Sequence, residues 1–157
     1  IAAMLKRYGL AANLLQLEIT ESFIMNQTED ALETLHRLKD LGLQLAIDDF
    51  GTGYSSLSYL KRLPLDTLKI DQSFVRGLPQ NPHDAAIARA IIALGHSLQL
   101  SVIAEGVETQ AQAQFLADAG CEQIQGFFIN RPLSAQLFAD KFLQPKRSVG
   151  MTRKAPV

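Results

Sequence analysis

The sequence predicts an α/β fold in which about five parallel strands alternate with helices. Short apolar runs of strand length alternate with longer segments whose apolar residues recur at helical spacing. Helices that connect consecutive strands make those strands parallel. The chain has 157 residues, 47% of them hydrophobic, which is enough for one domain with its own core. The pattern suits an open doubly wound sheet or part of a (β/α)8 barrel, and both place functional side chains beyond the carboxyl ends of the strands.

The first part of the chain is predicted to contain two helices and two strands. Gly9 ends the first helix, because glycine is the residue that most often follows a helix. Leu32, Leu35 and Leu38 recur at helical spacing, and Gly42 follows that helix. The predicted elements are a helix over 1–8, a strand over 15–20, a helix over 29–41, a strand over 43–47 and a loop over 50–53.

The second part repeats the alternation. Pro64 ends a short helix, because the residue before a proline avoids the helical region. Thr109 and Ser134 are good N-caps, and Gly120 follows a helix. The predicted elements are helices over 56–63, 84–98, 110–119 and 135–143, strands over 67–70, 100–104 and 123–129, and a loop over 78–82.

Composition narrows the possible classes of partner. The net charge of −1 gives no overall field that favours a DNA or RNA polymer or an anionic membrane. Cys121 is the only cysteine, which excludes an internal disulfide and a thiolate zinc cage. The sequence has no membrane-length apolar run and no signal peptide, so we expect a cytoplasmic location, compatible with a parent protein anchored at the inner membrane. We expect one domain over 1–144 and a basic, disordered tail over 145–157.

Acidic side chains lie in or directly after four of the predicted strands. They are Glu18 and Glu21, Asp48 and Asp49, Asp71, and Glu105 and Glu108. The carboxyl ends of parallel strands meet at one edge of a sheet, and carboxylates gathered there cannot all stay ionised unless cations join them. Hard oxygen ligands favour Mg²⁺ or Mn²⁺, and two such ions can flank the attacking and leaving oxygens of a phosphoryl displacement. The sequence therefore indicates a divalent-metal site with hydrolytic chemistry.

These acidic residues also have structural interpretations. Glu21 could belong to a helix cap, whereas a carboxylate inside an apolar strand, such as Glu18, needs a cation or a partner. Adjacent strand residues point to opposite sides, so Asp48 and Asp49 reach one site only if the backbone bends there; the alternative is an Asx turn.

Lys69 and three further polar segments complete the set of candidates. Lys69 lies on one strand face with Asp71; it could hold a substrate phosphate or orient a nucleophilic water while Asp71 holds it, or form a structural ion pair. The segment Gly51-Thr52-Gly53 is a weak phosphate-cradle signal, since it lacks the lysine and helix of a P-loop. Gln125 could bind a base edge or a metal-associated water, or make a buried hydrogen bond.

The combination and order of these motifs resemble the EAL-domain family of bacterial cyclic di-GMP phosphodiesterases. The matching segments are 17–21, 47–57, 68–71, 104–108 and 125–127, within a similarity that runs from about 14 to 143. The resemblance implies a partial TIM-like barrel, with one antiparallel strand in the family's complete barrel. It also implies two Mg²⁺ or Mn²⁺ ions and hydrolysis of cyclic di-GMP to linear pGpG.

The resemblance also implies roles for individual residues. Glu18, Asp48, Asp49 and Glu105 correspond to metal ligands, with Asp48 as the bridge. Lys69 corresponds to the lysine that binds or orients the nucleophilic water, and it is grouped with Asp71 and Glu105 as the catalytic set.

Other positions correspond to supporting or substrate-side roles. Glu21 corresponds to the glutamate that steadies the loop over 50–57. Glu108 corresponds to a residue that supports the metal ligands without binding the metal. Gln125, Thr52 and Gly53 correspond to positions on the substrate side.

The chain departs from the family because the Glu-Ala-Leu signature is absent. The similar triplet at 30–32 lies on a helix and is not its counterpart, and the family places that glutamate and an asparagine ligand on strands that would precede Ile1. We therefore interpret the chain as the carboxyl-terminal two-thirds of the domain, weakly active or inactive alone. Its expected partners are cyclic di-GMP, a second copy of the chain, and upstream sensor or GGDEF-type domains. Exposed edge strands favour self-association.

Two other functions are compatible with parts of this pattern. One is a non-catalytic EAL-like module that senses cyclic di-GMP or contacts a protein, although such modules usually lose metal-site acids and every visible position here keeps its acid. The other is an unrelated metal-dependent barrel enzyme such as a lyase, which would not explain the loop over 48–53.

Overall fold

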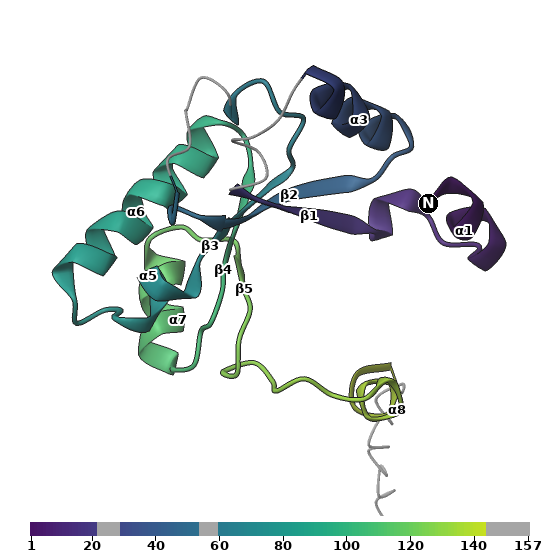
Figure 1. Ribbon diagram of the computed structural model, residues 1–157. Helices are drawn as coiled ribbons and strands as arrows, with labels where there is room; N and C mark the ends of the chain where they lie inside the picture. The colour runs from purple at the N-terminus through teal and green to yellow at the C-terminus, as the bar shows by residue number, and fades with distance from the viewer. Residues whose placement is uncertain (22–28, 54–59, 144–157) are drawn as a thin grey trace, which may run out of the picture.

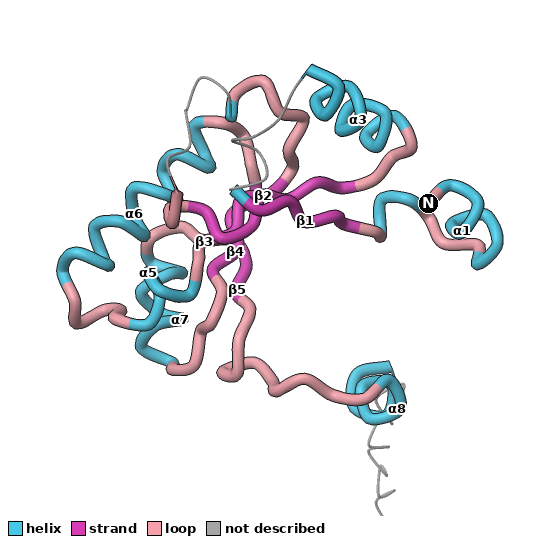
Figure 2. Tube along the Cα trace, in the orientation of Figure 1, coloured by secondary structure: helices cyan, strands magenta, loops and turns pink. Residues whose placement is uncertain are grey.

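Five strands form one parallel sheet, in the order in which they occur along the chain. The computed structural model describes residues 1–21, 29–53 and 60–143. The strands are β1 (Gln16–Thr20), β2 (Gln44–Phe50), β3 (Thr67–Ile70), β4 (Ser101–Ala104) and β5 (Gln123–Ile124). Every neighbouring pair is parallel, as the crossover helices predict. Figure 2 shows the sheet in magenta at the centre of the molecule.

The helices follow the alternation that the sequence predicts. They are α1 (Ala2–Tyr8), the 3₁₀ turn η1 (Ala12–Leu14), α3 (Glu29–Asp40), α5 (Gln72–Arg76), α6 (Pro82–Ser97), α7 (Gln110–Asp118), α8 (Ala135–Phe138) and the π-helical turn η2 (Ala139–Leu143). Figure 1 shows α5, α6 and α7 gathered on one side of the sheet, while α1 and α8 project away from it. The sheet is therefore covered by helices on one face.

The core lies between that face and the helices. Leu45, Ile47, Leu68 and Ile70 alternate along β2 and β3, and all are fully buried. They belong to one hydrophobic cluster with residues of α6 and α7, among them Leu116. Because side chains alternate along a strand, the residues between them face the other side of the sheet.

The second face of the sheet carries the polar side chains. One row of paired residues across the first four strands is Glu18, Ala46, Thr67 and Ser101. Residue Lys69, two positions beyond Thr67, therefore shares this face with Glu18. The sheet thus separates an apolar core from a polar face.

Two caps and most element types agree with the sequence prediction. Thr109 accepts a hydrogen bond from the Gln112 backbone N–H at the start of α7, and Ser134 accepts one from Leu137 at the start of α8. The predicted helix from 56 falls largely outside the described residues, as does the predicted tail after 144.

Most predicted boundaries agree to within one residue, and three differ by more. Strand β2 continues through Asp48 and Asp49 to Phe50 instead of ending at Ile47. Strand β5 ends at Ile124 because the chain beyond it packs against the turn after β4, where a side chain at Gly126 would collide with the Val107 backbone. Helix α6 already begins at Pro82, with Pro82 in the first turn, where a missing N–H costs nothing.

Helix α5 was not predicted at all. It has five residues, which is too short for an apolar period to be read from the sequence. Its recognisable signal is Asp71, whose side chain accepts a hydrogen bond from the Ser73 backbone N–H at 2.9 Å and caps the helix.

No helix within residues 1–21, 29–53 and 60–143 has the length and apolar character needed to cross a membrane.

Candidate active site

An irregularity in β2 brings two adjacent carboxylates to the same site. The pairing of β2 with β3 shifts between Ile47 and Phe50, and Asp49 has a φ of 53°. Aspartate is one of the few residues other than glycine that adopt this left-handed conformation readily. One oxygen each from Asp48, Asp49 and Glu105 lies within 4.8 Å of the other two. The backbone bend required for both aspartates to reach one site is therefore present.

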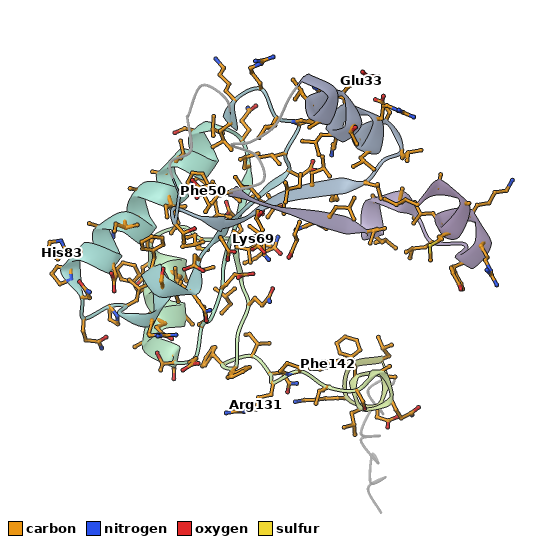
Figure 3. All side chains as sticks on the ribbon, viewed as in Figure 1. Glu33, Phe50, Lys69, His83, Arg131 and Phe142 are labelled. Atoms are coloured by element: carbon orange, nitrogen blue, oxygen red, sulfur yellow. The ribbon has the colours of Figure 1, made fainter. Side chains whose placement is uncertain are left out.

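Lys69 joins three of the carboxylates. Its Nζ lies 2.7 Å from Glu18 Oε1, 2.9 Å from Asp48 Oδ1 and 2.6 Å from Glu105 Oε1. The lysine is 3% exposed, and Figure 3 shows it among the strands. Burial opposes its charge, but the contacts with Glu105, Glu18 and Asp48 outweigh burial and raise the pKa of Lys69. Lys69 therefore stays protonated and draws together acids from β1, β2 and the turn after β4.

Asp71 contacts another aspartate instead of Lys69. Burial and the nearby Asp48 and Asp71 carboxylates raise the pKa of Asp49, which shares a hydrogen bond with Asp71. Burial also opposes ionisation of Asp71, but hydrogen bonds from Ser73 and Asp49 lower the pKa of Asp71. Our interpretation of Asp71 as the residue that holds Lys69 is therefore wrong, because the ion pairs of Lys69 are with other acids.

Glu21 holds the loop that follows β2. It is 2% exposed, and its Oε2 accepts hydrogen bonds from the backbone N–H groups of Gly51 at 3.0 Å and Gly53 at 3.1 Å. The Thr52 hydroxyl donates to the Asp49 carbonyl at 2.9 Å, and the Thr52 N–H points to the same carbonyl at 3.3 Å. The N–H groups of this loop are thus engaged within the protein, which argues against a backbone phosphate cradle.

A small pocket adjoins the acidic cluster. It has a volume of about 240 Å³ and is lined by Gln72, Glu105, Gly106, Glu108, Gln125, Gly126 and Phe127. The Gln125 side chain is exposed there and not buried, so the buried hydrogen bond considered for it is not formed. Gln72 was missed by the sequence reasoning because it lies in α5, which was itself not predicted.

The donor set fits a hard divalent cation. Asp48 Oδ1 is buried, and Lys69 Nζ lies 2.9 Å from it, a position where positive charge is already favoured. Oxygens of the Asp48, Asp49 and Glu105 carboxylates converge on one point. Carboxylate oxygens are the ligands that Mg²⁺, Mn²⁺ and Ca²⁺ prefer. A cation here would also offset the repulsion that raises the pKa of Asp49.

Comparison with known families identifies the domain. The family model of the EAL domain matches residues 1–132. The chain belongs to the EAL domain family. The partial TIM-like barrel predicted from the sequence is confirmed, since the five parallel strands and their helices superpose on EAL domain structures.

Two curated EAL domain relatives come from Pseudomonas aeruginosa. NbdA, named as a cyclic di-GMP phosphodiesterase, is 52% identical over 129 residues, which are 82% of this chain and 16% of NbdA. MucR, named as a bifunctional diguanylate cyclase/cyclic di-GMP phosphodiesterase, is 50% identical over 132 residues, which are 84% of this chain and 19% of MucR. The chain therefore spans less than a fifth of the length of either relative.

Two solved EAL structures share the fold. The PaMucR phosphodiesterase in complex with c-di-GMP superposes with a TM-score of 0.83 at 48% identity, covering 87% of this chain and 55% of that chain. BlrP1 of Klebsiella pneumoniae, solved as a manganese/cy-diGMP complex, superposes with a TM-score of 0.78 at 34% identity, covering 83% of this chain and 33% of BlrP1.

Proposed function

We propose that this EAL domain chain supplies the carboxylate and lysine side of an active site that hydrolyses cyclic di-GMP to linear pGpG. The observation that carries the proposal is the convergence of Asp48, Asp49 and Glu105, with Lys69 beside them, at the carboxyl edge of a parallel sheet. Support comes from two relatives that are named as cyclic di-GMP phosphodiesterases and are 52% and 50% identical in sequence to this chain. A structure of the MucR phosphodiesterase in complex with c-di-GMP gives further support.

The proposed cofactors are two divalent cations, Mg²⁺ or Mn²⁺, held by Glu18, Asp48, Asp49 and Glu105, with Asp48 as the shared ligand. Divalent cations supply positive charge that offsets the charge developing on phosphoryl oxygens and make water a better nucleophile. The manganese complex of BlrP1 supports the choice of metal.

The chain's own residues have defined tasks in this proposal. Lys69, already 2.6–2.9 Å from three carboxylates, orients the attacking water or a phosphate oxygen with its ammonium group. Asp71 sets the orientation of Asp49 through their shared hydrogen bond. Glu21 keeps the loop over 51–53 against the end of β1.

The substrate side of the proposed site is the pocket next to Glu105. Glu108 and Gln125 line it and offer hydrogen-bonding groups to a nucleotide, while Thr52 and Gly53 lie in the loop after β2. The chain covers 55% of the MucR phosphodiesterase chain. We therefore propose that further metal and substrate contacts come from the part of an EAL domain that this chain does not span, and that full activity requires them.

The substitution Asp48→Asn tests the assignment. It keeps the size of the side chain but removes the charge that would bind two cations, so hydrolysis in the full-length protein should fall below detection. Cyclic di-GMP and pGpG would be separated by chromatography after incubation with Mg²⁺ or Mn²⁺. Asp118→Asn is the matched control, because Asp118 is an exposed acid on α7 whose side chain accepts a hydrogen bond from Gln114.

Three outcomes distinguish the possible functions. Hydrolysis by wild type and Asp118→Asn but not by Asp48→Asn supports the proposal. Near-normal hydrolysis by Asp48→Asn contradicts the metal assignment. Tight nucleotide binding without hydrolysis in the wild type with either metal would indicate a sensor module instead of an enzyme.

A further inference from the structure

Gln112 is a buried polar residue whose side chain uses its hydrogen-bonding capacity fully. It lies in the first turn of α7 and is 6% exposed. Its Oε1 accepts from the backbone N–H groups of Glu108 at 2.8 Å and Thr109 at 2.9 Å. Its Nε2 donates to the carbonyls of Val75 at 3.2 Å and Arg76 at 3.3 Å. Both oxygen lone pairs and both N–H donors of the amide are therefore engaged.

These contacts go beyond helix capping. In a capping box, the side chain at the third position of the helix reaches only the backbone of the N-cap residue, here Thr109. Gln112 also binds the N–H of Glu108, and it crosses to the last turn of α5. A glutamine used only as a cap would need neither additional contact.

The two segments that Gln112 joins both carry site residues. The turn from 105 to 109 holds Glu105 and Glu108, and α5 begins directly after Asp71. They also pack closely where they meet, since a side chain at Gly106 would come within 2.6 Å of Gln72 Cβ. The start of α5 and the turn that carries Glu105 are therefore in direct contact.

We propose that Gln112 is a positioning residue that fixes the turn carrying Glu105 and Glu108 relative to α5 and Asp71. The role rests on the proposed function, because the geometry it maintains is that of the metal and substrate site. Replacing a residue that orients a metal ligand without binding the metal itself typically changes metal affinity or activity 10–100-fold. Gln112 performs for the turn after β4 what Glu21 does for the loop after β2.

The test compares Gln112→Ala with Gln112→Glu in the full-length protein. Alanine removes both sets of hydrogen bonds, so amide exchange at Glu108 and Thr109 should become faster. The dissociation constant for Mn²⁺, measured by electron paramagnetic resonance of free Mn²⁺, should rise about tenfold. The turnover number with cyclic di-GMP should fall about tenfold, and KM should rise as well, because the turn that Gln112 fixes also carries Glu108, which lines the pocket.

Gln112→Glu distinguishes the hydrogen bonds that the side chain accepts from those that it donates. Its carboxylate still accepts from Glu108 and Thr109, so the protection of these amides should remain. It cannot donate to Val75 and Arg76 and repels their carbonyls, so the Mn²⁺ and turnover defects should persist. Gln114→Ala is the control, since Gln114 lies on the same helix, is exposed and donates to Asp118 on that helix.

The possible results test the role of Gln112 and the proposed function separately. Wild-type Mn²⁺ affinity and turnover in both Gln112 variants, with faster amide exchange in the alanine variant, would reduce the residue to a helix cap and overturn the inference. If the wild type binds Mn²⁺ but does not hydrolyse cyclic di-GMP, the proposed function is overturned. The dissociation constants of the Gln112 variants for Mn²⁺ then still test the role of Gln112. A wild type without Mn²⁺ affinity overturns both.

Discussion

Lys69 shows how far single residues could be read from the sequence. A lysine in a buried strand needs carboxylate partners, and the sequence supplied several candidates. The structure pairs it with Glu18, Asp48 and Glu105 from three other segments, and not with Asp71 two positions away. The partners could not be predicted because they depend on strand register and on the irregularity at Asp49, which no local pattern encodes.

Replacing Lys69 with methionine should destabilise the metal-free protein. Without the ammonium group, three converging carboxylates repel one another, which should cost about 3 kcal/mol of unfolding free energy. Added Mn²⁺ should then raise the melting temperature more than it does in wild type, because the cation takes over the lost positive charge. Urea and thermal denaturation with and without Mn²⁺ measure both effects. Lys6→Met, on the surface of α1, is the control. Equal stability of Lys69→Met and wild type without metal would contradict this account.

At the scale of elements, the periodic spacing of apolar residues and the helix-capping residues determined which helices and strands could be predicted. The four longer strands and α3, α6 and α7 have clear apolar patterns, and Thr109 marks the start of α7. Helix α5 lacked a readable period, and β5 is cut short by a contact with the turn after β4, which is distant in the sequence. The candidate acids were found because they follow strands, whereas Gln72 and Gln112 were missed because they lie in helices.

Glu122 should make the stability of the β4–β5 region depend on pH. Its Oε2 accepts from the Val102 N–H at 2.9 Å, and its Oε1 lies 2.8 Å from His96 Nε2. Burial opposes ionisation, but these hydrogen bonds lower the pKa of Glu122 in the folded state. A lowered folded pKa stabilises the protein above the unfolded pKa of about 4.3, and that contribution disappears as the pH falls through the folded pKa.

Because the Glu122 side chain is 42% exposed and solvent screens its charge, Glu122→Gln should lose only about 0.5 kcal/mol of unfolding free energy at pH 7, and less below pH 4. Urea denaturation of the two proteins between pH 3 and pH 7 gives the difference. A stability difference that stays constant over this range would show that the charge of Glu122 contributes nothing.

At the scale of the whole molecule, both ends of the sheet leave apolar surface exposed. Near β1, Ile1 and the α1 residue Met4 are at least half exposed and border an apolar pocket. Beyond β5, Phe127 and Ile129 are at least half exposed and border another pocket. Figure 1 shows α1 and α8 extending away from the sheet on these two sides. Among the described strands, β1 and β5 each pair on one side only.

The 157-residue chain should therefore self-associate. Exposed edge strands and apolar surface favour pairing with a second chain. Light scattering coupled to size-exclusion chromatography should give a mass of a dimer or larger species that decreases on dilution. A single monomeric species at every concentration would contradict this expectation.

The most direct test of the central claim is hydrolysis of cyclic di-GMP with Mg²⁺ or Mn²⁺, measured for the 157-residue chain and for the full-length protein side by side. The proposal predicts pGpG from the full-length protein, loss of the reaction on adding EDTA, and little or no product from the chain alone. Absence of pGpG from both proteins under metal-replete conditions would contradict the claim that these acids form a phosphodiesterase site.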